Sequence, residues 1–314
     1  MTTHFTELAQ SAAADGKVSS EEVLALRRQG WGDGIIVREE AEALFALNNA
    51  LDERGAEWCD FFVEAIGEYV LNGTEPKRMC DETEARWLIE QIDHDGVMES
   101  LVELETLVRI IERAENVPSL LKDYVIEQVE KEVLTGTGPT RCGGELSDAH
   151  ITEAEAKILR RVIFAAGGYG PAAVSRFEAE MLFRLKDATT AERNAAEWDE
   201  VFLDGVSNYL KGFALQNAQL DHGRAKELEA FVADNQANVG RFMGRVFKEV
   251  PQAANHFGKV FGKKQDAGPS FEEQAAEGEA ITDYEQQWLD SMIEADGEID
   301  DLERRLLARI IEEG

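Results

Sequence analysis

Apolar residues recur along most of the chain at the spacing of an α-helix. In the stretch 58–70 every third or fourth residue is apolar, and the same stripe returns at 198–210. A run with this period buries one face of a helix, and no alternating run with hairpin turns stands out. The sequence therefore predicts an all-α fold. The first stripe consists of Trp58, Phe61, Phe62, Ala65, Ile66, Tyr69 and Val70.

A large part of the chain recurs later in the same order. Four pairs of stretches match: 15–28 with 148–161, 37–47 with 175–185, 58–70 with 198–210, and 84–98 with 285–299. The offset is 133–140 residues for the first three pairs and 201 for the last. Matched segments in the same order indicate an internal repeat. We therefore predict two copies of one helical bundle, in which Trp58 pairs with Trp198 and Trp87 with Trp288 as core residues.

The offsets divide the chain into three parts. The first repeat spans 1–113, and a helix with a Gly/Thr/Pro-rich linker follows at 114–144. The second repeat spans 145–314 and contains about 60 additional residues, an insert at about 213–278. Such glycine- and proline-rich stretches are typical of joins between units.

Asp-Gly turns precede several of the predicted helices, at 15–16, 33–34, 95–96 and 296–297. One interpretation needs no metal: the glycine makes a tight turn, and the next helix is capped by a Ser, Thr or Asp together with a Glu three residues later. The other interpretation places the glycine at position 6 of a calcium loop, which requires oxygen ligands at positions 1, 3, 5, 7, 9 and 12. The sequence leaves both open.

No turn supplies a complete set of calcium ligands. The last turn is the best candidate, with acids at positions 3, 5, 9 and 12 but Met292 at position 1. The turn at Gly96 has Val102 where the bidentate glutamate belongs. The candidate ligands for a divalent cation, Ca²⁺ or Mg²⁺, are Asp15, Glu22, Asp93, Asp95, Glu294, Asp296, Asp300 and Glu303.

The stretches AADGKVSSEEVLAL (13–26) and EADGEIDDLERRLLARI (294–310) resemble the Asp-Gly turns of TerB-like domains, the helical tellurite-resistance proteins, and of the N-terminal domain of DjlA-type co-chaperones. The resemblance covers about a third of the chain. It implies an acidic helical bundle connected with metal or chemical stress, and a divalent cation bound by clustered acids. This chain departs from the pattern by its tandem arrangement and by its insert. In the second repeat, Ala149 also stands at the position that Gly16 has in the first.

Charge is distributed unevenly along the chain. Its net charge of −31 disfavours nucleic acid as a partner, yet the segment 236–264 carries six Lys or Arg against one Glu. Apolar residues of this segment share one helical face, which is typical of membrane-surface or partner-docking elements. Docking on the chain's own acidic surface, on a protein partner or on a membrane surface all stay open. The candidate partner-binding residues are Arg241, Phe242, Arg245, Val246, Lys248, Phe257 and Phe261.

The sequence carries none of the common catalytic signatures. The chain has no HExxH, GxSxG or P-loop motif, and no Glu-x-x-His pair of a di-iron bundle. Its three cysteines form no CxxC pair, and the first residues resemble no secretory signal. We therefore expect a cytoplasmic, non-enzymatic binding module of a stress-response or envelope-linked assembly, which binds a cation at the Asp-Gly turns or is recruited through 236–264.

Overall fold

The computed structural model describes residues 2–12, 14, 16–30, 35–93, 98, 100–141, 150–165, 174–210, 283–295 and 299–313, and the regular elements among them are helices joined by turns and loops. The all-α prediction is confirmed, since no β-sheet occurs among these residues. None of the described helices combines the length and apolar character needed to cross a bilayer. The elements are α1 (Thr2–Ala12), α2 (Ser20–Gly30), α3 (Arg38–Ala50), α4 (Ala56–Asn72), α5 (Glu82–Ile92), α6 (Leu101–Arg113), α7 (Ser119–Thr135), the short 3-10 helix η2 (Pro139–Arg141), α8 (Glu153–Ile163), α9 (Arg176–Thr189), α10 (Ala196–Leu210), α15 (Asp283–Ile293) and α16 (Asp301–Glu313).

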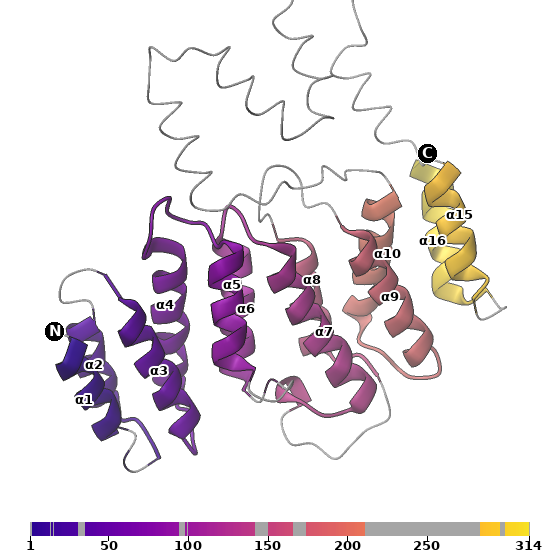
Figure 1. Ribbon diagram of the computed structural model, residues 1–314. Coiled ribbons are helices and arrows are strands. Elements are labelled where there is room, and N and C mark those ends of the chain that lie inside the picture. Colours follow the sequence, from indigo (N-terminus) through magenta and orange to yellow (C-terminus); the bar gives the residue numbers. More distant parts are fainter. Residues whose placement is uncertain are drawn as a thin grey trace, which may run out of the picture.

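The helices form a two-layer array in which each helix packs on the one two places further along. In one layer α1 contacts α3, α3 contacts α5, α5 contacts α7 and α7 contacts α9. In the other, α2 contacts α4, α4 contacts α6, α6 contacts α8, α8 contacts α10 and α10 contacts α16. Figure 1 shows these helices following one another in chain order, from α1 and α2 in indigo to α15 and α16 in yellow.

Local chemistry explains where several helices begin and end. Capping boxes, in which an N-cap side chain and a glutamate three residues later exchange hydrogen bonds with each other's backbone N–H, start α5, α8 and α9. Gly136 ends α7 with a φ of 67°, a left-handed conformation that a side chain would disfavour. Pro118 stands at the N-cap of α7.

The two predicted repeats contain aromatic clusters of matching geometry. The two Phe rings of each cluster lie 5.1 Å apart in both halves, and the first Phe lies 5.8 Å from the Trp in both. The Tyr and Trp rings are 4.9 Å apart in the first half and 4.6 Å in the second. This agreement supports the predicted duplication, which stays a prediction. The counterparts are Phe45/Phe183, Phe62/Phe202, Tyr69/Tyr209 and Trp87/Trp288.

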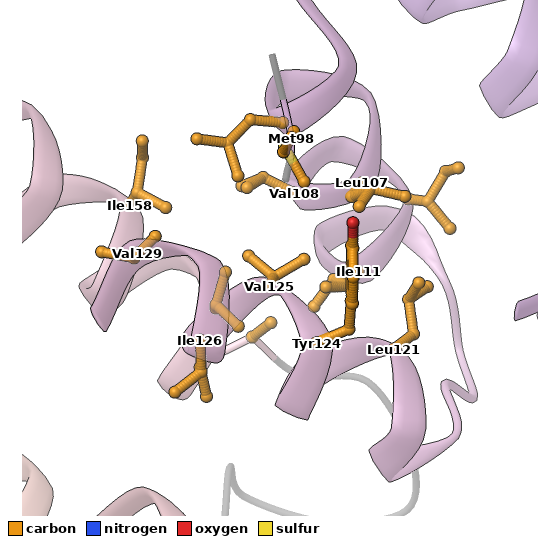
Figure 2. Packing of buried hydrophobic residues seen from close by; sticks show 14 of the residues in the cluster. Met98, Leu107, Val108, Ile111, Leu121, Tyr124, Val125, Ile126, Val129 and Ile158 are labelled. Atoms are coloured by element: carbon orange, nitrogen blue, oxygen red, sulfur yellow. The ribbon is translucent and has the colours of Figure 1, made fainter. Parts of the chain in front are cut away.

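The segment 114–144, predicted as a connection, contributes α7 to the body of the array. This helix packs on α5 and α6 of the first half and on α8 and α9 of the second. Figure 2 shows Val108 and Ile111 of α6 pointing toward Val125 of α7, with Ile158 of α8 nearby. One connected group of buried residues runs from α1 to α16. The predicted halves therefore share a single core across the boundary at 113.

The last helix has a more polar outer side than its counterpart in the first half. Both α6 and α16 contain the sequence Arg-Ile-Ile-Glu, at 109–112 and 309–312. Leu104 and Val108 of α6 are fully buried, whereas the matching residues Arg304 and Ala308 are exposed. The insert at 213–278, with its segment 236–264, lies entirely within 211–282 and so outside the described residues.

Two isoleucines at matching positions of α6 and α16 test this difference between the two helices. Ile111 is 0% exposed and Ile311 is 79% exposed. We expect Ile111→Ala to lower the free energy of unfolding by about 2–5 kcal/mol, because a buried cavity is created. Ile311→Ala should change it by no more than about 0.5 kcal/mol. Urea unfolding followed by circular dichroism measures both, and a similar loss for the two variants would contradict the assignment.

Candidate functional site

Glu22, a predicted metal ligand, caps a helix. Its Oε2 accepts hydrogen bonds from the backbone N–H of Ser19 at 2.9 Å and from the Ser19 hydroxyl at 2.6 Å. The backbone N–H of Glu22 donates in return to the Ser19 hydroxyl oxygen at 3.3 Å. This is the capping arrangement that needs no metal. Asp15, which the prediction placed beside Glu22, lies outside the described residues.

Asp300 and Glu303, at the last Asp-Gly turn, cap α16 in the same way. The backbone N–H of Asp300 donates to Glu303 Oε2 at 3.0 Å, and that of Glu303 donates to Asp300 Oδ1 at 2.8 Å. Each carboxylate keeps its second oxygen for another contact. Glu303 is fully buried, so that second oxygen requires a partner inside the protein.

The partner is the ammonium group of Lys186 on α9. Its Nζ lies 2.6 Å from Glu303 Oε1, 2.9 Å from Asp300 Oδ2 and 2.8 Å from Asp187 Oδ1. The Lys186 side chain is only 3% exposed. Burial alone would lower the pKa of Lys186, but hydrogen bonds to the three carboxylates outweigh it and raise the pKa. An ammonium ion thus holds two of the carboxylates that the sequence offered to a metal.

The first half solves the same problem without a cation on α3. Asn48, the counterpart of Lys186, donates from its side-chain amide to Glu103 Oε1 at 3.0 Å. Asn48 is fully buried and Glu103 nearly so. Glu103 occupies the third position of α6, as Glu303 does in α16, because the turn before α6 is one residue longer. The prediction that Val102 replaces the glutamate is therefore corrected: Glu103 takes its place.

The other predicted ligands do not meet at a common point in the described structure. Asp93 ends α5, where its backbone N–H donates to the Ile89 carbonyl oxygen at 2.7 Å. Glu294 is exposed in the turn after α15. Among the described residues, no three His, Cys, Asp or Glu side chains are grouped as a metal site would need. Asp95, Asp296 and all the candidate partner-binding residues of 236–264 lie outside that part of the chain.

A groove between α4 and α6 is a feature that the sequence did not reveal. It consists of two adjoining cavities of about 770 and 580 Å³ that share Cys59, Leu101 and Val102. We call it the α4–α6 groove. Its apolar floor includes Val63, and Leu101 is 47% exposed although it is a leucine. The charged residues of the smaller cavity are Asp60, Glu64, Glu105, Arg109 and Arg113, and those of the larger are Arg54, Lys131 and Glu132.

The matching surface of the second half is bridged by ion pairs. Arg305 of α16 contacts Asp199 and Glu200 of α10, and Arg309 lies 2.8 Å from Asp204. The first-half counterparts of Arg305, Asp199 and Glu200 are, in that order, Glu105, Cys59 and Asp60. An acid at position 105 cannot pair with another acid on α4.

Glu105 pairs with α8 instead. Its two carboxylate oxygens lie 2.7 and 2.9 Å from the Arg161 guanidinium, which also contacts Glu112. This bidentate pairing is a strong form of ion pair. The same Arg161 guanidinium lowers the pKa of Glu112, chiefly through the hydrogen bond that it donates to that carboxylate. The groove side of α6 is thereby left without the bridge that α16 makes to α10.

Near the groove, a buried polar network fastens η2 to the array. The Thr140 N–H donates to Glu132 Oε2 at 3.0 Å, and the Arg141 guanidinium pairs with Glu155 at 2.9 Å. Glu155 is fully buried at the third position of α8. Burial raises the pKa of Glu132, although hydrogen bonds from Thr140 oppose the rise. The network supplies a cation, Arg141, for another buried glutamate at a helix start.

Sequence reasoning missed Lys186 and the groove, although signals for both were present. Lys186 follows the apolar stripe of 175–185 at a position where a core residue is expected, and its counterpart Asn48 is also polar. Two polar residues at matched core positions indicate a buried partner. The charge exchange between Glu105 and Arg305 was visible once the register of the last helices was known.

Removal of the Lys186 ammonium should expose its structural role. We expect Lys186→Met to lower the free energy of unfolding by about 3–5 kcal/mol, because Glu303 and Asp300 would keep buried charges without a counter-ion. The double variant Lys186→Met/Glu303→Gln should recover part of that loss. Urea unfolding measures both.

Lys157, which pairs with Glu153 on the surface, provides the matched control. Lys157→Met should leave the free energy of unfolding nearly unchanged, because exposed ion pairs contribute little. If Lys186→Met is no more harmful than Lys157→Met, the buried ammonium is not what holds α16 to α9.

Comparisons with known proteins do not identify a family for this chain. No protein-family model, no curated protein and no solved structure matches the chain. The likeness to TerB-like domains accordingly rests on the Asp-Gly turns and the helices that follow them.

Proposed function

We propose that this chain is a non-enzymatic binding module with a TerB-like architecture, and that the α4–α6 groove binds a basic amphipathic helix. The observation that carries the proposal is the contrast between the halves: α10 and α16 are joined by ion pairs, whereas α4 and α6 enclose an open groove. Ligand sites are concave and mostly apolar, with a few charged groups that set orientation. The groove has these properties.

The floor and the rim of the groove favour a helix with mixed character. Cys59, Val63 and Leu101 offer an apolar floor, on which an amphipathic helix lays its apolar face. Asp60 supplies a negative charge beside it, which favours a Lys or Arg on the flank of the ligand. Glu64 and Glu105 also line the groove but already pair with Arg27 and Arg161. Arg109 and Arg113 give one end a positive charge, which suits the carbonyl end of a bound helix.

The proposed cellular role is also that of a binding module. We propose that the module acts in the cytoplasm in a stress-response or envelope-linked assembly, as the TerB-like resemblance implies. Its ligand is a protein segment, because the net charge of −31 opposes nucleic acid and anionic lipid. The perturbed acids described above cap helices or form ion pairs, which supports a binding role over a catalytic one.

Binding of a helix can be measured with a labelled peptide of residues 236–250. The protein would be the full chain carrying Phe242→Ser and Val246→Ser, so that its own segment does not compete. We expect micromolar affinity by fluorescence anisotropy, on the order of −7 to −8 kcal/mol. Adding Leu101→Asp, which copies Asp301 of the second half, should weaken binding at least about tenfold.

Leu24, 50% exposed on α2, is the matched control for Leu101. Leu24→Asp should leave the affinity unchanged, because Leu24 is remote from the groove residues in the sequence and is not among its lining. Equal weakening by both substitutions, or no binding at all by the parent protein, would overturn the proposed function.

Cation binding at the Asp-Gly turns is the weaker proposal, because Lys186 already neutralises Asp300 and Glu303. If Ca²⁺ or Mg²⁺ binds at the last turn, it should raise the Tm of the native chain, and raise that of Lys186→Met further because the carboxylates are released. Melting curves in calcium and in chelator measure this. Identical curves for both proteins would remove the ion role at that turn.

A further inference from the structure

We infer that the larger cavity of the α4–α6 groove binds the phosphate group of a small organic molecule at the N-terminus of α6. This inference goes beyond the proposed function, because it concerns another class of ligand at one end of the groove. The cavity has a volume of about 770 Å³ and is lined by residues of α4, α6 and α7. That volume lies within the range of small-molecule sites.

The start of α6 lacks the capping that its counterpart α16 has. In α16 the side chains of Asp300 and Glu303 accept hydrogen bonds from backbone N–H groups at the helix start. The N-cap residue of α6 is Ser100, whose side chain makes no capping hydrogen bond. No described contact gives an acceptor to the backbone N–H of Leu101 or Val102, and both residues line the cavity. Such N–H groups, together with the helix dipole, favour a phosphate.

A buried amide on α7 adds donors that are already oriented. The Gln128 side chain is 8% exposed and lines the cavity. Its Oε1 accepts a hydrogen bond from the backbone N–H of Met98 at 3.3 Å, so the amide nitrogen occupies the other position. Among the described contacts this nitrogen has no acceptor. An amide donor with so little access to water gains from an acceptor that a ligand brings.

The charged residues of the cavity also suit an anion. Arg54 and Lys131 line it, together with the acid Glu132. The Arg54 guanidinium donates to the side-chain and backbone oxygens of Asn48 at 3.1 and 2.9 Å, so its described acceptors are neutral. Glu132 Oε2 already accepts a hydrogen bond from the Thr140 N–H at 3.0 Å. A small anion therefore meets a locally positive lining, although the chain as a whole carries a charge of −31.

A phosphate group fits this donor set better than a carboxylate does. Its three terminal oxygens can accept from the helix start, the amide and the guanidinium at once. The cavity also has room beside the phosphate, where Met98, Leu101, Val102 and Pro139 supply apolar side chains. The expected ligand is therefore a phosphomonoester with a compact apolar body.

Phenyl phosphate is the probe, and ligand-observed NMR with the full chain measures its affinity. The titration is made at about pH 7.5, where the phosphate is mostly dianionic because its second pKa is about 6. We expect saturable binding with a Kd on the order of 1 mM. Benzoate, which has a carboxylate in place of the phosphate, should bind at least about tenfold more weakly, and phenol more weakly still. Equal affinity for phenyl phosphate and either of these compounds would refute a phosphate site.

Ser100→Asp copies Asp300 of the second half and tests the helix start. It should weaken phenyl phosphate binding at least about tenfold, because the new carboxylate accepts from the N–H groups and repels the anion. Its Tm should not fall, since Asp is a favourable N-cap residue. Ser19→Asp is the matched control, because Ser19 caps α2 and does not line the cavity. This control should bind phenyl phosphate as the native chain does.

Gln128→Glu tests the buried amide separately. The glutamate keeps an acceptor for the Met98 N–H but removes the amide donor, so binding about tenfold weaker is expected. Unchanged affinity in Gln128→Glu or in Ser100→Asp would place the ligand elsewhere and so contradict the inference. No binding by the native chain, or equal weakening by Ser100→Asp and Ser19→Asp, would contradict it as well. Peptide binding is measured with a different ligand, so its failure would remove the proposed function and leave this inference standing.

Discussion

The array depends on a constraint at the start of α6, α8 and α16: a glutamate at the third position is buried, and its second oxygen needs a partner inside the protein. Such a glutamate satisfies free N–H groups at the helix start, which α8 and α16 show directly. Its second oxygen then lies in the core, where an unpaired charge is costly. Glu103, Glu155 and Glu303 receive this second contact from Asn48, Arg141 and Lys186 respectively.

Each of those contacts fastens a different pair of elements. Asn48 joins α3 to α6, Arg141 joins the turn η2 to α8, and Lys186 joins α9 to α16. The buried polar contacts therefore lie between elements distant in sequence, while the apolar stripes fill the layers between them. Buried polar pairs add specificity to apolar packing, since only one register satisfies them. In this fold they favour one pairing of elements: α3 with α6, η2 with α8, and α9 with α16.

The local part of the structure could be predicted from the sequence. The helical stripes at 58–70 and 198–210 and the caps at Ser19–Glu22 and Thr152–Glu155 follow from rules that span a few residues. Lys186 could not be assigned, because its three carboxylates come from its own neighbour and from a turn more than a hundred residues away. Glu103 stood one step late in the sequence pattern because the turn before α6 is one residue longer.

The groove follows from the place of α6 within the array. Among the described residues α6 packs on α4 on one side and on α8 on the other, and its Glu105 pairs with Arg161 of α8. Arg305, at the same position of α16, bridges to Asp199 of α10 instead. The matching helices α6 and α16 therefore differ: α16 is joined to α10 by ion pairs, whereas the surface beside α4 and α6 is left open for a ligand.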